Sequence, residues 1–277
     1  MVNIVKKLKE LKKKYRYSMI LLRELVITDF KLRYQGSALG YLWSLLRPMF
    51  LFIIMYVVFV YFLRIGRGIP HWPVALLLGT VMWSFFAEIT NGGLKSVVSQ
   101  GGLLRKINFP KYIVVVAGAI SAFINFAINL CVVFVFTLIN GVELSWSMPL
   151  LIFYIVELFV FGLGLAFILG TVYVRLRDVK HIWDILMQGL FYATGIFFPM
   201  STIAQQSPLI AKILMLSPVS HAIQGARHVF ISSEIMNLSD LTANVFIQFT
   251  PIVITVSVFI FGAYIFRKKS SNFAEYA

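Results

Sequence analysis

Six long runs of apolar residues divide the chain, and each approaches the length that an α-helix needs to cross a membrane. A bilayer hydrocarbon core about 30 Å thick needs about 20 helical residues. The pattern predicts six spans, at Tyr41–Leu63, Val74–Val97, Tyr112–Leu138, Pro149–Val174, Ile182–Phe198 and Val245–Phe266. Pro48 and Pro251 lie inside the first and last runs, where we expect kinks or displaced helix starts. The expected fold is an all-α integral membrane protein, with a transmembrane domain over 41–266 between a segment of 1–40 and a tail of 267–277.

The segment before the first run also has a helical pattern. Apolar residues recur every three or four positions, and the stripe includes Met19, Leu22, Val26 and Phe30. This spacing predicts an amphipathic helix that lies on the membrane surface. Two roles stay open for this helix, an anchor to anionic lipids or a lever against a cytoplasmic partner.

A second segment outside the spans lies between the fifth and sixth runs. Leu209–Leu216 is apolar but far too short to cross a membrane, and it is bracketed by Ser207-Pro208 and Ser217-Pro218. A re-entrant helical hairpin fits this pattern, because irregular backbone at membrane depth must be buried in protein or line a cavity. A helix lying flat at the interface fits as well.

Composition and charge narrow the function classes. With 60% apolar and only 13% charged residues among 277, the chain is neither a soluble globular domain nor a disordered one. A net charge of +14 would suit nucleic-acid binding, but 21 of the 25 cations fall before Pro48 and at Lys95–Lys111, Arg175–Lys180 and Arg267–Lys269. The positive-inside rule places these four groups in the cytoplasm. We therefore expect both termini in the cytoplasm, contact with membrane lipids and no nucleic-acid partner.

Polar side chains lie inside several predicted spans at helical spacing. The stripes include Ser84 and Glu88, Asn125 and Asn129, and Gln188 and Tyr192, and one face of the first span carries Phe52, Tyr56 and Phe59. A carboxylate in lipid is costly, so these faces should point at protein or water. They either line a polar channel or hydrogen-bond one helix to another. Gly162, Ala166 and Gly170 repeat a small residue every four positions, which predicts close packing of another helix.

The sequence offers little for catalysis. No G-x-x-x-x-G-K-[ST] phosphate loop, H-E-x-x-H or G-x-S-x-G motif occurs. Cys131 is the only cysteine, and His221 and His228, which could share a helix face, have no evident further ligands. We therefore expect no catalytic residue, no metal and no cofactor in this chain. A rival hypothesis, a secondary transporter centred on Glu88 and Glu157, calls for paired broken helices that the pattern does not show.

Four segments carry a more specific pattern. They are LRELVITDFKLRYQGSALGYLWSLLRPMF at 22–50, GGLLRKINFPKY at 101–112, VYVRLRDVKHIWDILMQGLFYATGIFFP at 172–199 and LSPVSHAIQGARHVF at 216–230. Together they resemble the membrane subunits of bacterial ABC exporters of the type-2 permease class, which carry O-antigen and teichoic-acid polymers. Arg47 stands where relatives often have Asn.

The resemblance implies a permease subunit that forms a homodimer and binds two separate ATPase subunits, which supply the site for ATP and Mg. It implies an interface helix near 15–34, a gate helix near 37–46, a coupling loop at about 99–108 and re-entrant helices at about 201–230. The residues implied in coupling to the ATPase are Arg23, Glu24, Lys31, Gly101, Leu103, Leu104, Arg105 and Lys106.

By the same resemblance, the substrate is a long glycan or polyol-phosphate polymer on undecaprenyl diphosphate, moved out across the bacterial cytoplasmic membrane. The expected entrance residues are Arg33, Tyr34, Tyr41, Trp43 and Arg47, and the expected exit residues are Ser217, Pro218 and Arg227. The polar and aromatic stripes described above, from Phe52 to Tyr192, are expected to line the channel. Export of a small lipid or drug is the alternative, and the sequence leaves open O-antigen against teichoic acid.

Overall fold

The computed structural model describes residues 17–29, 31–32, 40–102, 107, 109–143 and 145–273, and every regular element in these ranges is helical. Residues 17–29 form a first helix. The following elements are η1 (Gly40–Leu42), α2 (Trp43–Met55), the π-helical η2 (Tyr56–Phe62), α3 (Trp72–Ser99), α5 (Tyr112–Ile139), α6 (Leu150–Tyr173), α7 (Val179–Ala193), α8 (Met200–Gln206), α9 (Pro208–Met215), α10 (Pro218–Phe230), α11 (Leu238–Leu241), α12 (Val245–Lys269) and η3 (Ser270–Asn272).

Five of the described helices are long and apolar enough to cross a membrane. They are α2 together with η2, and then α3, α5, α6 and α12. These five match the first four predicted spans and the last one. Helices α9 and α10 form a pair bent by 99°, and this pair is a sixth candidate if it is counted as one span.

The fifth predicted span, Ile182–Phe198, differs from the structure. Helix α7 has 15 residues and ends at Ala193, so at 1.5 Å per residue it is only about 22 Å long. The apolar run continues to Phe198, but Gly195 has a φ of 64° and turns the chain out of the helix. The prediction that this run crosses the membrane as one helix is therefore wrong in its outer part.

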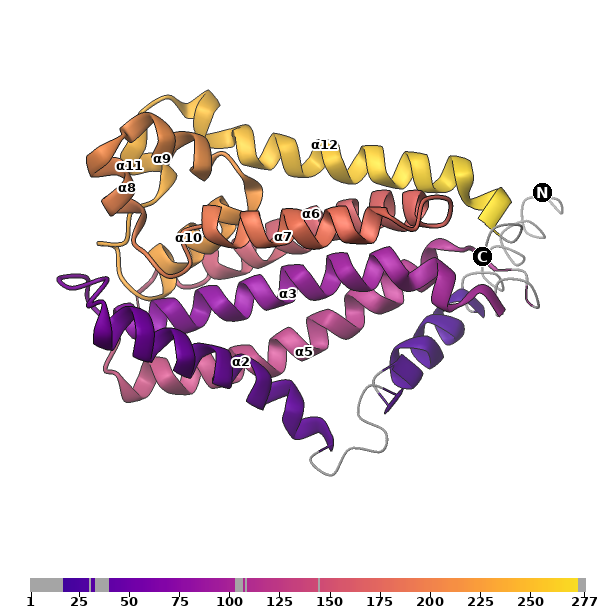
Figure 1. The fold of residues 1–277 in the computed structure, drawn as a ribbon, viewed down its shortest axis with the longest axis horizontal. Helices are drawn as coiled ribbons and strands as arrows, with labels where there is room; N and C mark the ends of the chain where they lie inside the picture. Colours follow the sequence, from indigo (N-terminus) through magenta and orange to yellow (C-terminus); the bar gives the residue numbers. More distant parts are fainter. Residues whose placement is uncertain are drawn as a thin grey trace, which may run out of the picture.

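The long helices lie side by side, with two distinct ends (Figure 1). The α6–α7 connection and the C-terminal end of α12 lie at one end, and these segments carry Arg175–Lys180 and Arg267–Lys269. Helices α8, α9 and α11 gather at the opposite end, where the connection between η2 and α3 also lies. We call the cation-rich end the inner end and the opposite one the outer end.

Helix α3 is the centre of the bundle, because small residues let its neighbours approach closely. A side chain at Gly93 of α3 would collide with Ala166 of α6, and one at Gly170 would lie 2.8 Å from the Gly93 carbonyl. Helix α12 packs on the other side of α6 in the same way, where a Cβ at Gly164 would lie 2.7 Å from the backbone of Phe259. The predicted packing role of the small-residue stripe is confirmed.

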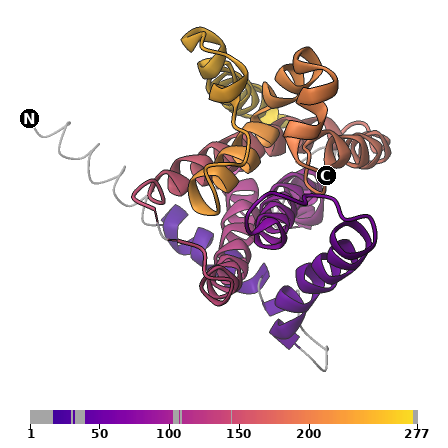
Figure 2. The same ribbon diagram turned by 90° about the vertical axis from the view of Figure 1, so that its left-hand side faces the viewer.

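The first span lies at the edge of the bundle when the bundle is seen from the outer end (Figure 2), where it packs on α3 and α5. Helix α2 continues through Leu46 and Pro48, so a gate helix ending at Leu46 is not separated from the span in the described part. Pro48 has no N–H to give to the Ser44 carbonyl, four residues earlier. Asn129 of α5 donates its side-chain N–H to that carbonyl instead, at 3.2 Å. A tertiary hydrogen bond therefore supports the helix at its proline.

The helix over residues 17–29 packs on the bundle through a face that differs from the predicted stripe. Leu21, Leu22 and Leu25 contact the hydrophobic core, whereas Met19, a member of the predicted stripe, is 65% exposed. Leu22 of the predicted stripe thus lies on the packed face together with Leu21 and Leu25. A role for this helix at the membrane surface stays a prediction.

Candidate functional site

The polar stripes of α3 and α5 face one another. Asn125 donates its side-chain N–H groups to both carboxylate oxygens of Glu88, at 3.2 and 3.3 Å. Asn129 is buried against Ser44, and the hydroxyl of Ser84 donates to the Thr80 carbonyl of its own helix at 2.8 Å. Asn125 and Asn129 thus join helices through hydrogen bonds, whereas Ser84 bonds within its own helix.

The aromatic stripe of the first span contains both buried and exposed rings. Phe52 and Asn129 are buried in the single chain, and the channel role expected of the stripe residues stays a prediction. Phe59 stacks on Phe197, with ring centroids 4.7 Å apart, and joins the outer end of the first span to the turn after α7. Of the predicted channel residues, Tyr56, Gln188 and Tyr192 are the exposed ones.

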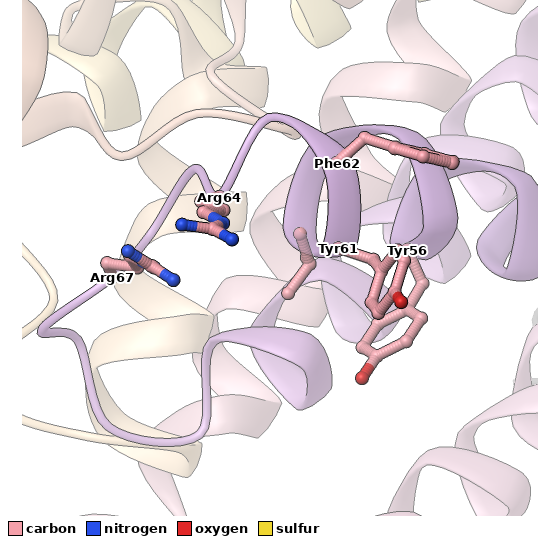
Figure 3. Close-up of a pocket in the computed structure, with 6 residues that line it drawn as sticks. Tyr56, Tyr61, Phe62, Arg64 and Arg67 are labelled. Atoms are coloured by element: carbon pink, nitrogen blue, oxygen red, sulfur yellow. The ribbon is translucent and has the colours of Figure 1, made fainter.

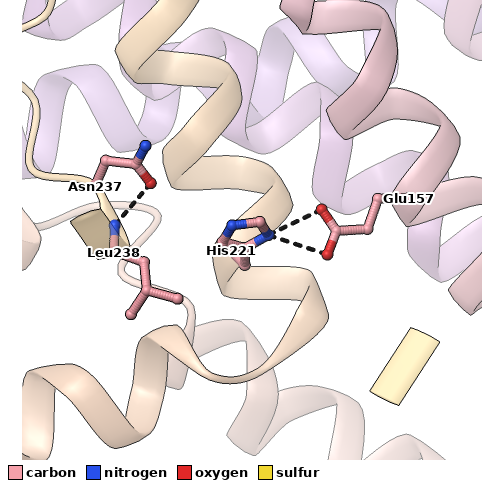
Figure 4. Close-up of polar contacts among 4 residues, drawn as sticks. All are labelled: Glu157, His221, Asn237 and Leu238. Atoms are coloured by element: carbon pink, nitrogen blue, oxygen red, sulfur yellow. Dashed lines mark hydrogen bonds and ion pairs between the residues drawn. The ribbon is translucent and has the colours of Figure 1, made fainter. Parts of the chain in front are cut away.

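A buried ion-pair candidate connects α6 to α10 near the outer end (Figure 4). The Nδ1 atom of His221 lies 2.9 and 3.0 Å from the two carboxylate oxygens of Glu157. Both residues are buried, and the ring of Tyr154 packs edge-on against the imidazole at 5.5 Å. Glu157, an isolated acid in the sequence, thus has a partner 64 residues away. His228, on the same helix, has a different partner, because its Nδ1 lies 2.7 Å from the Ile235 carbonyl.

We expect removal of the Glu157 carboxylate to destabilise the protein through His221. In Glu157→Leu the buried imidazole loses its partner, which costs about 1–3 kcal/mol. The double variant Glu157→Leu, His221→Leu should be destabilised by less than the sum of the two single variants, because both polar groups are then replaced. Thermal unfolding of the purified protein measures all three, and strictly additive losses would contradict the coupling.

Arg227 of α10 is the most deeply buried cation among the described residues, with no exposed surface. Its Nε donates to the Ala75 carbonyl at the start of α3, at 2.8 Å. Its two terminal nitrogens donate to the carbonyls of Gly195 and Ile196 in the turn after α7, at 2.9 and 2.5 Å. One guanidinium group therefore holds three separate segments of the outer end together.

The surroundings of Arg227 are shaped to hold its side chain. The guanidinium lies over the ring of Trp72, 5.2 Å from its centroid, which is a favourable cation–π distance. Gly79 leaves room for it, because a Cβ there would collide with the guanidinium nitrogens. Gln224, one turn earlier, donates to the carbonyls of Thr194 and Gly195 at 2.9 and 3.1 Å. Within the described ranges, carbonyl dipoles rather than carboxylates balance this charge.

The exit residues predicted with Arg227 lie at the start of α10. Ser217 precedes Pro218, which is the first residue of α10, and a similar Ser-Pro pair begins α9. The two Ser-Pro pairs that bracket the apolar run thus lie at the starts of α9 and α10. Helix α10 is buried along most of its length between α6 and α3. Entry of this pair into the membrane stays a prediction.

The predicted coupling and entrance residues are only partly described. Gly101 is buried, and the side chains of Arg23, Glu24, Lys31, Trp43 and Arg47 are exposed. Leu103, Leu104, Arg105, Lys106, Arg33 and Tyr34 lie outside the described residues, as does the side chain of Tyr41. At the inner end of α7, the Asp184 carboxylate accepts a hydrogen bond from Lys180 at 2.8 Å and raises the pKa of Lys180.

The architecture defines the class of protein first. Several apolar helices long enough to cross a bilayer make this a multi-pass membrane protein, and no cluster of three or more His, Cys, Asp or Glu side chains converges in the described part of the chain. The family model of the ABC-2 type transporter matches residues 21–231. The chain therefore belongs to the ABC-2 type transporter family.

Curated relatives match along almost the whole chain. The O-antigen export system permease protein RfbA of Myxococcus xanthus is 27% identical over 263 residues, covering 94% of this chain and 96% of the relative. The protein of the same name from Klebsiella pneumoniae is 27% identical over 271 residues, covering 96% and 98%. The polysialic acid transport protein KpsM of Escherichia coli is 22% identical over 219 residues, covering 76% and 81%.

Proposed function

We propose that this chain is the membrane subunit of an ATP-driven exporter that moves a cell-envelope polysaccharide out of the cytoplasm. The observation that carries the proposal is the near full-length similarity to O-antigen export permeases within a matched ABC-2 family. The chain has no phosphate loop of its own, so the nucleotide and its Mg would be bound by a separate ATPase subunit. The coupling residues are those of the loop at 99–108 and of the helix over 17–29.

The proposed transporter contains two copies of this chain and two ATPase subunits in the bacterial cytoplasmic membrane, with both termini of each copy inside. Support comes from α2, η2 and α7, whose outward faces remain uncovered in one subunit. Tyr56, Gln188 and Tyr192 lie on these faces. Two copies joined through them would enclose aromatic and polar side chains along the path of a glycan, where aromatic rings cover the apolar side of sugar rings.

The proposed substrate is linked to undecaprenyl diphosphate, and the linked polymer is an O-antigen or a teichoic acid. The exposed Trp43 and Arg47 near the inner end of α2 support an entrance there. An arginine binds diphosphate oxygens strongly because its guanidinium matches their geometry. Arg33 and Tyr34 complete the proposed entrance from the sequence side.

A genetic and biochemical experiment tests this proposal. Deletion of the gene should leave lipid-linked polymer inside the cell and remove it from the surface, and the purified chain should bring an ATPase subunit with it. ATP hydrolysis by that complex should rise with a lipid-linked glycan and not with a small lipid or drug. An isolated chain that transports without an ATPase, or an ATPase stimulated only by drugs, would overturn the proposal.

A further inference from the structure

The connection between η2 and α3 forms a pocket at the outer end. Of the residues expected at the entrance or along the channel, only Tyr56 lines this pocket. The pocket has a volume of about 420 Å³ and is lined by Tyr56, Val60, Tyr61, Phe62, Arg64 and Arg67. Figure 3 shows the guanidinium groups of Arg64 and Arg67 beside one another, and the rings of Tyr56 and Tyr61 on the opposite side of the pocket. Two cations thus face a pair of aromatic rings.

The helix is wound to present these rings together. Residues 56–62 form a π-helical segment, a rare conformation that is frequent at functional sites. The wider turn places Tyr56, Val60 and Tyr61 along the same pocket. The rings of Tyr61 and Phe62 remain 70% exposed. In an α-helix these side chains would point in other directions relative to one another, because an α-helical turn is almost one residue shorter than a π-helical turn.

Backbone hydrogen bonds fix the shape of the connection between η2 and α3. The amide of Ile65 donates to the Phe59 carbonyl at 2.8 Å, and the amide of Ile69 donates to the Gly66 carbonyl at 3.1 Å. Arg64 has a φ of 57°, a left-handed conformation that is unfavourable for a residue with a side chain and that clusters at ligand-binding sites. The backbone is therefore held so that Arg64 points into the pocket region.

The charge in this pocket is not balanced by the protein in the described ranges. Arg64 and Arg67 are exposed and neither forms an ion pair with a described acidic residue. Two neighbouring guanidinium groups repel one another and attract an anion. Phosphate and carboxylate groups match guanidinium geometry best.

The pocket is also connected to the Arg227 contacts. Gly66 lies so close to the Trp72 ring that a side chain there would collide with it. Trp72 is 2% exposed, and the Arg227 guanidinium lies over the same ring, 5.2 Å from its centroid. A ligand that moves the connection at Gly66 would therefore press on Trp72 and on the segments that Arg227 holds.

We propose that Arg64 and Arg67, with the rings of Tyr56 and Tyr61, form an outer-end binding site for the anionic groups of the exported polymer, its phosphates or carboxylates. The inference rests on the proposed function and adds the charge class of the substrate. A lipid headgroup would supply the same phosphate chemistry, but the adjoining aromatic rings fit sugar rings, which a headgroup does not require. The site makes the polymer's charge a determinant of release at the outer face.

The test uses the complex of this chain with its ATPase in nanodiscs of zwitterionic phosphatidylcholine. The probes are a fluorescent oligosialic acid and a neutral oligomannose of equal length. The variants are the pairs Arg64→Gln with Arg67→Gln, which removes both charges, and Arg64→Lys with Arg67→Lys, which keeps them. Lys212→Gln, a single outer-end cation in α9, is the matched control.

Affinity for oligosialic acid should fall by about tenfold or more in the double Gln variant, and its salt dependence should weaken. The double Lys variant should keep most of the affinity, and the control should keep all of it. Equal affinity of the wild type for both probes, or unchanged oligosialic acid binding by the double Gln variant, overturns the inference. Selective retention of phosphatidylglycerol by the wild type, without oligosialic acid binding, also overturns it in favour of a lipid site.

This outcome is separable from that of the proposed function. A chain that exports polymer in cells but shows no charge-dependent binding disproves the pocket and leaves the exporter intact. A chain that exports no polymer and brings no ATPase disproves the exporter, whatever its pocket binds.

Discussion

Replacement of Arg227 by methionine is expected to lower the midpoint of thermal unfolding by about 4–8 °C and to abolish export. Methionine fills a similar volume but donates no hydrogen bond, so the carbonyls of Ala75 and Ile196 lose the donors seen here. The Ile196 carbonyl, left without a donor, costs about 1–3 kcal/mol, and the hydrogen bond lost at Ala75, whose carbonyl keeps its partner within α3, adds about 1 kcal/mol, so the loss is at least about 2 kcal/mol. The shift follows from that loss at about 2–4 °C per kcal/mol for a chain of this size.

Loss of export is expected because Arg227 joins elements that form the outer end. It connects α10 to the start of α3 and to the turn after α7. Arg227→Lys should recover only part of the stability, because one ammonium group lacks the planar fork that reaches both segments. Arg267→Met, a change of the same kind at an exposed residue of α12, is the control and should change the unfolding free energy by less than about 0.5 kcal/mol.

Gly79→Ala tests the same site without removing the charge. The new Cβ would collide with the Arg227 guanidinium, so the side chain has to leave its carbonyl partners. The variant should therefore resemble Arg227→Met in its unfolding midpoint. The unfolding midpoints of both variants are measured on purified protein in the same detergent as the wild type. If both midpoints lie within about 1 °C of wild type, these hydrogen bonds do not stabilise the outer end.

Much of the fold follows from the sequence because bilayer thickness fixes helix length. Long apolar runs give α3, α5, α6 and α12 within a few residues of their bounds. The stripe of Gly162, Ala166 and Gly170 predicts the close approach of another helix, because small side chains are a local property of one helix, and the structure identifies that helix as α3. Pro208 and Pro218 mark helix starts for a local reason too, since proline favours the first turn.

What hydropathy could not predict depends on backbone conformation and on distant partners. The run ending at Phe198 is uniformly apolar, so nothing in its composition shows that Gly195 takes a left-handed φ and ends α7 early. The face of α5 that carries Asn129 was predictable, but its partner was not. That partner is a carbonyl made available by Pro48, 81 positions before Asn129, and it becomes visible only when α2 and α5 pack together.

The same distinction explains Arg227. In the sequence it is one basic residue, eight positions after Val219 of the Ser217-Pro218-Val219 segment, and no diagnostic motif lies between them. Its role depends on carbonyls 152, 32 and 31 residues away, and a carbonyl carries no signal in the sequence. The one usable signal in the sequence was the position of a cation near an apolar helix. A buried cation is costly unless several hydrogen-bond acceptors surround it.

If the proposed function holds, charge reversal in the loop proposed to contact the ATPase, Arg105→Glu with Lys106→Glu, is expected to abolish export while the chain still inserts into the membrane. These two residues lie outside the described part, but the flanks are described, and both Gly101 and Phe109 are buried. A loop fixed at both ends can pass a displacement from an ATPase surface to α3 and α5. Placing like charges against each other at a docking surface costs several kcal/mol, enough to remove the complex at cellular concentrations.

Lys268→Glu with Lys269→Glu is the matched control, because it reverses two exposed cations at the same inner end, at the last turn of α12. Surface polymer, membrane insertion and co-purified ATPase are measured for both pairs. Loss of polymer and ATPase in the loop variant alone supports contact between the loop and the ATPase. Equal losses in the two pairs would mean that only total inner charge matters, and normal export by the loop variant would remove this loop from the coupling mechanism.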